Sequence, residues 1–379
     1  MIPTRSATRA VLAVRAKFAN GWLDTRAARF VLMAVLALVA LTAQAGMLVQ
    51  PEPHWGGVAP RYSGYYCDGR LKRTVPRRLG KGLHGEVLLG ESSSGGQQVA
   101  IKVGFRRGDI EREASVLAAM AGVPGFPTVL LNQPPNEQSK GGVLVMELLG
   151  PSLDELCQRI APYTYLSGPT VMRVGRGALS PLHQLHVAGY VHNDVKPGNL
   201  LLGRGATSSA LHLIDFGLAT LASDMCPDSA WRRDMLKGTP SFASLAAHYS
   251  RRPMRPVDDI ESLVYTLAYL AAGGLPWEGL PEAEVAQLKK RAMTEGCHVF
   301  TDPIHSPTVA TALRTIWAEV TRCRGDGRGP VGSPSRASSV DYGACMAALR
   351  SGVDGKEDVP YDWEERGQER ADTPYYWSA

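Results

Sequence analysis

The sequence predicts a two-lobed α+β fold, in which a small, mainly antiparallel sheet with one helix precedes a larger, mainly helical lobe. Three observations support this prediction. Two apolar runs flank a glycine-rich turn from Leu79 onward, a third apolar run ends at Lys102, and an apolar run from Val143 leads through a short hinge into a helix. Strand-like runs around a glycine-rich turn are typical of a hairpin. We expect the small lobe and hinge at residues 76–150 and the large lobe at residues 151–350.

The composition is that of a globular protein. The chain has 379 residues, 44% of them hydrophobic and 20% charged, with a formal net charge of +5. The basic residues are dispersed, so we expect no nucleic-acid binding. The cysteines are widely spaced and form no CxxC pair, which favours unpaired thiols over a disulfide framework; they are Cys67, Cys157, Cys226, Cys297, Cys323 and Cys345.

The N-terminus has the pattern of a targeting sequence. Residues 1–29 form a basic leader with a single acid, Asp24, and residues 30–49 are uncharged. This pattern is typical of a signal or membrane-anchor segment, and Ala43-Gln44-Ala45 has the form of a cleavage site. We expect membrane association through residues 30–49, with membrane, secretory or organellar targeting. The alternatives are that residues 30–49 form a buried helix, or that the protein is cytoplasmic and the leader does not act as a targeting signal.

Two stretches show little periodicity. Residues 50–75 are rich in Pro, Gly and Tyr and read as a linker. Residues 351–379 combine acidic residues and glycine with exposed aromatics and read as a flexible tail.

The glycine-rich turn has phosphate-binding chemistry. Gly80, Gly82 and Gly85 make G-x-G-x-x-G, a spacing that dinucleotide-binding folds also use. Here an apolar strand from Glu86 follows the turn, whereas a dinucleotide-binding turn opens a helix. The sequence therefore favours a hairpin that covers phosphates, since glycine backbone can approach them closely.

A lysine and a helix follow the hairpin. Val99-Ala100-Ile101-Lys102 matches the V-A-I-K signature of protein kinases, whose lysine contacts the α- and β-phosphates of ATP. The helix expected from Asp109 to Met120 offers Glu113 or Glu111 as the partner of Lys102.

The segment that joins the lobes comes next. The apolar run from Val143 ends at Met146, and a helix begins after Pro151. Strand, hinge and helix in this order indicate an adenine pocket, in which Met146 limits access and backbone groups of residues 147–149 bond the base.

The strongest signals lie in two loops of the large lobe. His192, Asp194 and Asn199 fit H-x-D-x-x-x-x-N, and Asp215-Phe216-Gly217 supplies D-F-G. Phosphoryl transfer requires a positioned hydroxyl, Mg²⁺ and charge neutralisation. We therefore predict that Asp194 accepts the substrate proton, that Lys196 lies beside the γ-phosphate, and that Asn199 and Asp215 hold the metal.

Two histidines precede these loops at helical i, i+3 spacing. His183 and His186 lack a third ligand pattern, so we expect them to pack within a helix and not to bind a metal.

With these motifs the chain resembles the casein kinase I group of eukaryotic serine/threonine protein kinases, including the vaccinia-related kinases. The stretches that carry the resemblance are EASVLAAMAGVPGFPTVL from Glu113, VLVMELLGPSLDEL from Val143, HNDVKPGNLLL from His192, KGTPSFASLAAH from Lys237 and DDIESLVYTLAYLAAGGLPWEGL from Asp258. Ala243-Ser244-Leu245-Ala246 stands where most kinases have A-P-E, which is this group's substitution.

The resemblance covers residues 76–350 and implies the protein kinase fold, ATP and Mg²⁺ as cofactors, protein substrates and a monomeric catalytic domain. It selects Glu113 over Glu111 as the partner of Lys102. It also makes Asp259 the acid that supports the catalytic loop, the loop of His192, Asp194 and Asn199. The ATP-binding residues that it implies are Gly80, Lys81, Gly82, Gly85, Val87, Ala100, Lys102, Glu113, Met146, Glu147 and Leu149.

One departure from the group bears on regulation. Asn193 stands where the group usually has an arginine that pairs with a phosphorylated activation loop. Because asparagine cannot form this charged pair, Asn193 predicts activity without phosphorylation of the activation loop. The alternative to an enzyme is a pseudokinase or a nucleotide-binding scaffold anchored at a membrane, although the three residues whose loss marks a pseudokinase, Lys102, Asp194 and Asp215, are present.

Overall fold

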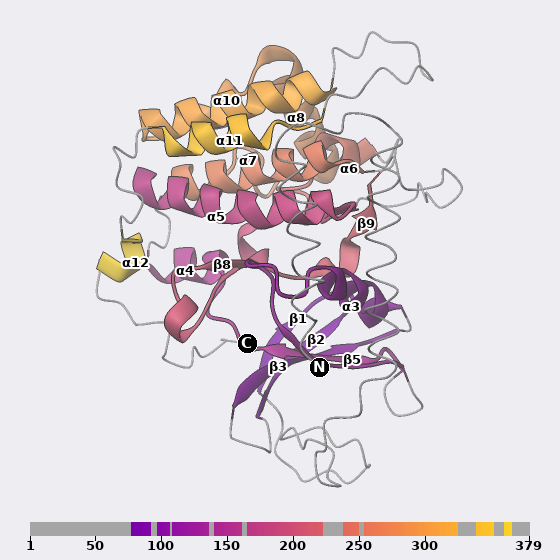
Figure 1. Cartoon of the computed structure of the whole chain (residues 1–379). Coiled ribbons are helices and arrows are strands. Elements are labelled where there is room, and N and C mark those ends of the chain that lie inside the picture. Colours follow the sequence, from indigo (N-terminus) through magenta and orange to yellow (C-terminus); the bar gives the residue numbers. More distant parts are fainter. Residues whose placement is uncertain are drawn as a thin grey trace, which may run out of the picture. The chain divides into compact units, whose positions relative to one another are not determined.

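A five-stranded antiparallel sheet forms the small lobe of the computed structural model (Figure 1). Its strands stand in the order β1-β2-β3-β5-β4, so that β3 lies at the centre. They are β1 (Arg78–Lys81), β2 (Gly85–Glu91), β3 (Gln98–Gly104), β4 (Val129–Gln133) and β5 (Val143–Glu147). The expected α+β arrangement of a hairpin, a third strand and a hinge strand is therefore confirmed.

The structure describes residues 77–91, 97–106, 108–135, 140–160, 165–222, 238–249, 254–324, 339–351 and 360–365. The predicted leader, hydrophobic segment and linker lie outside these ranges. Within the ranges, no helix has both the length and the apolar character that crossing a bilayer requires. Membrane association through residues 30–49 therefore stays a prediction.

The side chains of β5 alternate between two hydrophobic clusters. Leu144 and Met146 belong to the large core shared with the helical lobe, whereas Val143 and Val145 join a small cluster on the other face of the sheet. They separate in this way because successive strand residues point to opposite faces. The hinge strand is thereby fixed on both sides.

The helix of the small lobe, α3 (Asp109–Ala119), packs against the sheet. Ile110 and Glu113 are both buried, and their i, i+3 spacing puts them on one face. The helix follows Gly108, whose φ of 94° is one that glycine adopts readily. Glu111 accepts a hydrogen bond from the N–H of Gly108 at 2.8 Å. Glu111 therefore caps the helix, while Glu113 points inward.

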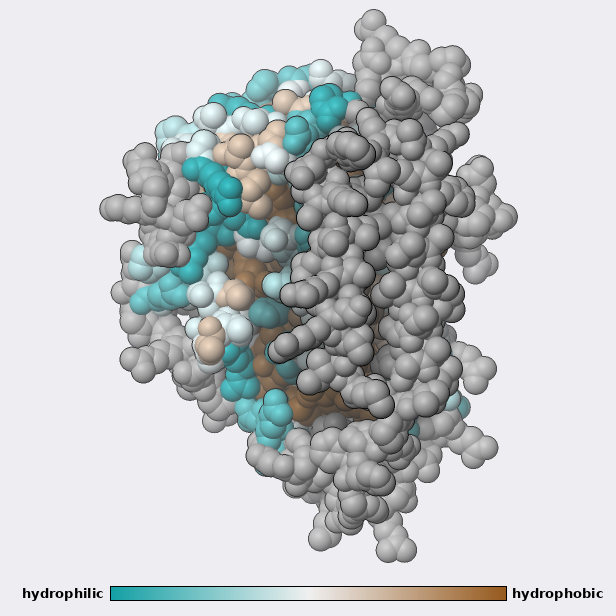
Figure 2. Space-filling view, in the orientation of Figure 1, coloured by the Kyte–Doolittle hydropathy of each residue, from teal (hydrophilic) through white to brown (hydrophobic). Residues whose placement is uncertain are grey.

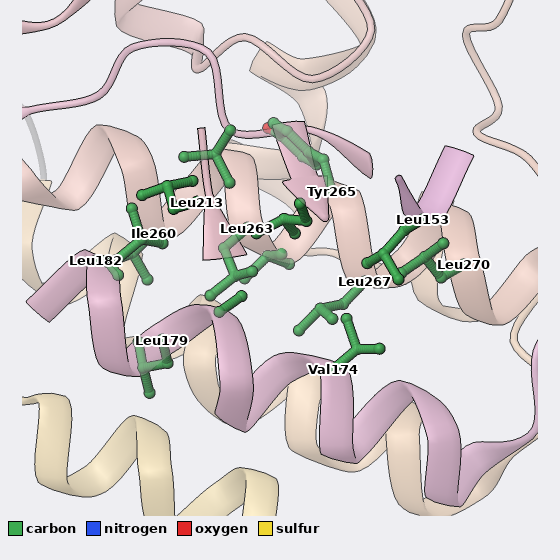
Figure 3. Packing of buried hydrophobic residues seen from close by; sticks show 14 of the residues in the cluster. Leu153, Val174, Leu179, Leu182, Leu213, Ile260, Leu263, Tyr265, Leu267 and Leu270 are labelled. Carbon is green, nitrogen blue, oxygen red and sulfur yellow. The ribbon is translucent and has the colours of Figure 1, made fainter. Parts of the chain in front are cut away.

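The large lobe is built around α7 (Pro256–Ala272), nearly all of whose residues are buried. A helix that is apolar on most sides belongs in the interior. Figure 3 shows Leu179 and Leu182 of the neighbouring helix α5 (Gly168–Val187) near Ile260 and Leu263 of α7. Each fully buried leucine contributes about 1.5–3 kcal/mol. The other helices of this lobe are α4 (Leu153–Ile160), α5 (Gly168–Val187), α6 (Leu245–Tyr249), α8 (Glu282–Glu295), α9 (His298–Thr301), α10 (Pro307–Arg324) and α11 (Tyr342–Arg350).

Two short strand pairs place the loops that carry the motifs. β6 (Tyr190–Val191) pairs with β9 (Thr220–Leu221), and β7 (Leu200–Leu202) pairs with β8 (Leu211–Leu213). The loop between β6 and β7 and the loop between β8 and β9 therefore start and end at paired strands, which brings them together.

Part of the predicted flexible tail packs against α5. Tyr361 and Trp363 are buried, although the acidic composition of this stretch predicts a free tail. Asp362 begins α12 (Asp362–Glu365) and accepts hydrogen bonds from the Ser167 N–H at 2.7 Å and the Thr170 hydroxyl at 2.9 Å. A carboxylate is favourable at a helix N-terminus such as that of α5. The packed residues 360–365 are thus part of the fold, because aromatic burial and this cap outweigh the polar composition.

The surface and the free cysteines of the described residues are those of a globular protein. Figure 2 shows brown, hydrophobic residues near the middle of the view, with teal, hydrophilic residues beside them. The four cysteines in the described ranges are free, which confirms the expected thiols for Cys157, Cys297, Cys323 and Cys345. Cys67 and Cys226 lie outside the described residues.

Candidate active site

A cavity of about 350 Å³ is lined by the glycine-rich turn, β3, α3, the hinge and the two loops of the large lobe. All of the predicted site residues line it except Asp194. They are Gly80, Lys81, Gly82, Gly85, Val87, Ala100, Lys102, Glu113, Met146, Glu147, Leu149, Lys196, Asn199 and Asp215. Asp194 lies beside the cavity, with its carboxylate 2.8 Å from the Lys196 ammonium.

The glycine-rich turn leaves room above the cavity. A Cβ atom added to Gly80 or Gly82 would meet no other atom within 4 Å, so their backbone faces open space. At Gly85 a Cβ would lie 2.4 Å from the carbonyl oxygen of Val103, so the close approach of β2 and β3 requires glycine there. Because glycine has no side chain, the backbone N–H groups at Gly80 and Gly82 can approach an anionic ligand.

Lys102 forms a buried ion pair with two carboxylates. Its Nζ lies 2.5 Å from Oε2 of Glu113 and 2.8 Å from Oδ1 of Asp215. Burial lowers the pKa of Lys102, but the two carboxylates outweigh burial and raise it. The lysine is therefore a cation at neutral pH, and the pairing goes to Glu113 rather than Glu111.

Asp215 is an ionised carboxylate held in a strained backbone conformation. Burial raises its pKa, but the Lys102 ammonium outweighs this effect and lowers the pKa to about 2. Its φ of 64° lies in the left-handed region, which is uncommon outside glycine and clusters at functional sites. The result is a fixed negative charge at the edge of the cavity.

Asp194 lies at the centre of a hydrogen-bond network. One of its carboxylate oxygens accepts from both the N–H and the hydroxyl of Thr239, each at 2.9 Å. Asn199 donates its side-chain amide to the Asp194 carbonyl at 2.8 Å. The Lys196 ammonium donates to the Thr239 hydroxyl at 2.8 Å. These bonds orient the Asp194 carboxylate without surrounding it on every side.

Asp259 holds the start of the catalytic loop from below, as the resemblance implies. Its carboxylate accepts from the backbone N–H groups of His192 at 2.6 Å and Asn193 at 2.9 Å, and it lies 2.8 Å from Nε2 of His186. A carboxylate that is 1% exposed is tolerated because three donors surround it. The loop therefore has a rigid base.

The histidine pair of α5 meets a tyrosine from α11. Nδ1 of His186 lies 2.5 Å from the Tyr342 hydroxyl, and the His183 ring stacks on the Tyr342 ring with centroids 4.1 Å apart. The pair therefore connects α11 to Asp259 and the catalytic loop.

Aromatic contacts join the two loops of the site. The His192 ring meets the Phe216 ring edge-on at 5.1 Å, and Phe216 stacks on Phe126 at 5.8 Å. Nε2 of His192 lies 2.9 Å from the Ile214 carbonyl oxygen. These contacts fix the backbone on both sides of Asp215.

The residues fit the expected ATP and Mg²⁺. Val87, Ala100 and Met146 give the cavity an apolar wall suited to a flat base. Gly80 and Gly82, whose backbone no side chain covers, line the same cavity as the Lys102 cation. Asn199 and Asp215 present side-chain oxygens, which Mg²⁺ prefers.

Several residues of the site were not singled out in the sequence. Leu79, Leu201 and Ile214 add apolar surface to the cavity. Thr239 bonds to Asp194 from a segment far along the chain. The available signal was Gly238 before it, whose φ is 92° and whose added Cβ would lie 2.5 Å from the Asn193 carbonyl oxygen.

His84 was also not singled out. It lies in the glycine-rich turn, and its Nδ1 is 3.2 Å from the Asp109 carboxylate. The turn is thereby linked to the first residue of α3.

A comparison with family models agrees with this geometry. The model described as protein kinase domain matches residues 73–319, well over half of the chain. The matched range contains the glycine-rich turn, Lys102, both motif loops and α7, and it ends within α10.

Proposed function

Because this chain belongs to the protein kinase domain family, we propose that it transfers the γ-phosphoryl group of ATP to serine and threonine hydroxyls of protein substrates. One observation carries the proposal. The paired Asp194 and Lys196 stand at the edge of the cavity that the Lys102–Asp215 ion pair lines. This contact supports a role for Asp194 in orienting the hydroxyl and for Lys196 in binding the phosphate.

The residues divide the work of phosphoryl transfer. The protein supplies positioning and charge, since little covalent chemistry is required of it. Asp194 accepts the hydrogen bond of the attacking hydroxyl and then its proton, which leaves Lys196 free to face the transferred group. Lys102 orients the α- and β-phosphates, and Asn199 and Asp215 would hold Mg²⁺. When bound, the metal neutralises charge on the phosphate oxygens.

The narrower proposal is an enzyme of the casein kinase I type. It is supported by the sequence of residues 237–248, where Ala243-Ser244-Leu245-Ala246 replaces A-P-E, and by the sequence of α7. Preference for serine and threonine rests on the same resemblance.

A phosphotransfer assay with the full-length chain tests the proposal. Labelled ATP with Mg²⁺ is offered with dephosphorylated casein and with acidic and basic peptides, and the labelled amino acids are identified. We expect label on serine or threonine, and its loss in Asp194→Asn. Label confined to tyrosine would overturn the specificity, and nucleotide binding without any transfer would favour the scaffold alternative.

We also propose that the leader directs the protein to a membrane or an organelle. Residues 1–49 support membrane or organelle targeting, because basic residues precede an uncharged apolar stretch. A fluorescent reporter fused to residues 1–60 tests this. A diffuse cytosolic signal would eliminate targeting, and a membrane-bound fusion of unreduced size would select an anchor over a cleaved signal.

A further inference from the structure

Lys289 of α8 is a fully buried lysine that touches the segment following Thr239. Its exposed fraction is 0%. Its Nζ donates to the carbonyl oxygens of Pro240 at 2.7 Å and Ala243 at 2.6 Å, and it lies 3.3 Å from Nε2 of His248. Burying an ammonium is costly unless its donors are used. Lys289 therefore has a specific task at this position.

Aromatic rings complete the surroundings of this ammonium. Its Nζ lies 4.7 Å from the centroid of the Tyr265 ring and 5.4 Å from that of Trp277, within the range of cation–π attraction. Trp277 also donates its ring N–H to the Ser241 carbonyl at 2.9 Å. The carbonyl groups of Pro240, Ser241 and Ala243 are thus all held by the interior of the large lobe.

The anchored segment adjoins the place of the acceptor hydroxyl. That hydroxyl must come within hydrogen-bond reach of the Asp194 carboxylate to lose its proton there. Thr239 bonds to the same carboxylate, and Pro240 follows it in the chain. Residues 239–243 therefore begin beside the place of the acceptor hydroxyl, where the residues that flank the acceptor can contact them.

We propose that Lys289 is a positioning residue for the protein substrate: by holding the carbonyl groups of Pro240 and Ala243, it fixes the segment against which the residues flanking the acceptor bind. The inference rests on the proposed function and adds to it a determinant of substrate binding. It assigns this task to a residue that touches neither the nucleotide cavity nor Asp194.

The charge of the anchor changes near neutral pH. Burial lowers the pKa of Lys289 to about 7, although Glu261 of α7 raises it. Below this pH the charged ammonium offers three N–H donors to its neighbours, and above it the neutral amine offers two weaker ones. The anchor therefore weakens as the pH rises through about 7.

Two ionisable groups around Lys289, His248 and Tyr265, have pKa values far from neutral pH. Burial and the Lys289 charge lower the pKa of His248 in α6 to about 4, and burial raises the pKa of Tyr265 in α7 well above its usual value. Glu261 is paired with Arg324, and Glu282 of α8 lies on the far side of His248, 3.9 Å from its Nδ1. Unlike His248 and Tyr265, Lys289 therefore changes its charge between about pH 6 and about pH 8.

The test compares Lys289→Met with Lys290→Met, its exposed neighbour on α8. Both are made in the full chain and assayed near pH 6.5 with dephosphorylated casein and ATP. For Lys289→Met we expect the KM for casein to rise about tenfold, the effect of losing hydrogen bonds from a charged donor, with the KM for ATP within about twofold of the wild type. Lys290→Met should match the wild type. An unchanged casein KM, or an equal rise in both KM values, would overturn the proposal.

A second variant decides the matter if Lys289→Met does not fold. Lys289→Gln keeps N–H donors and removes the titrating amine, so its casein KM should be independent of pH between about 6 and about 8, whereas that of the wild type should rise. The same pH dependence in both proteins would contradict the inference. If the wild type transfers no phosphate at all, the proposed function fails; if it does and only these comparisons fail, the inference alone is lost.

Discussion

The side-chain amide of Asn193 donates to the hydroxyl of Thr220 at 2.9 Å and to the carbonyl oxygen of Leu218 at 2.8 Å. These bonds tie the catalytic loop to the strand that leaves the D-F-G motif. The φ of Asn193 is 71°, in the left-handed region that asparagine tolerates better than most residues. The neutral amide of Asn193 therefore joins the catalytic loop to β9 without a phosphate group.

We accordingly expect activity without phosphorylation of the activation segment, much of which lies outside the described residues. Phosphatase-treated full-length protein should keep at least about half of its starting activity, because the Asn193 contacts do not depend on added charge. Mass spectrometry confirms that the phosphate is gone. A fall to a few per cent of the starting activity would refute this expectation.

The variant Lys102→Met should lower kcat by about a hundredfold or more, with a smaller effect on ATP binding. The lysine supplies positive charge where negative charge shifts during transfer, and losing one such group has an effect of this size. Glu113→Gln is the matched control, since it leaves the lysine in place without its buried partner. We expect the double variant to be little worse than Lys102→Met, because the two residues act as a unit. Near wild-type turnover in Lys102→Met would show that the lysine has another role.

The variant Asp215→Asn should abolish Mg²⁺-dependent transfer and leave the fold intact. The carboxylate carries a full charge because its pKa is held at about 2, and an amide of the same shape offers the metal only a neutral oxygen. The thermal midpoint with a non-hydrolysable ATP analogue should therefore stop responding to Mg²⁺. An unchanged Mg²⁺ response, or full activity, would contradict the metal assignment.

Local patterns predicted the small lobe and most of the site. The hairpin, Lys102 and the hinge at the end of β5 follow from strand periodicity and the glycine-rich turn. Within that turn, the close approach of Gly85 to Val103 requires a glycine. The choice of Glu113 followed from the resemblance, and α3 shows its physical basis, since Glu111 caps the helix and Glu113 shares a face with Ile110.

Tertiary contacts decided what the sequence did not show. Thr239 reaches Asp194 from a segment 45 residues further along, and the one local signal of that contact is Gly238 before it. Lys289 looks like a solvated lysine beside Lys290, although its spacing from the buried Val285 and Ala292 places it on the apolar stripe of α8. A lysine on such a stripe is a signal that sequence reasoning can use.

The contact between Tyr342 and His186 leads to the last prediction. The Asp259 carboxylate accepts a hydrogen bond from Nε2 of His186, and Nδ1 of the same ring lies 2.5 Å from the Tyr342 hydroxyl. The hydroxyl thus holds the His186 ring in the orientation in which Nε2 reaches Asp259, and Asp259 in turn holds the backbone beside Asp194. Tyr342 lies beyond the range that the family model matches.

Tyr342→Phe removes this hydroxyl and keeps the ring that stacks on His183. We expect kcat to fall about threefold to tenfold, with the KM for ATP little changed, and the free energy of unfolding to fall by about 1 kcal/mol, the usual value of one hydrogen bond. Tyr165→Phe, at a 45% exposed tyrosine, is the matched control and should change neither quantity. A drop in stability with unchanged kcat would reduce Tyr342 to a packing residue. A fall in kcat of the expected size, with an unchanged control, would instead place α11 among the elements that position the catalytic loop. The loss of one oxygen atom would then change the position of Asp194 through His186 and Asp259.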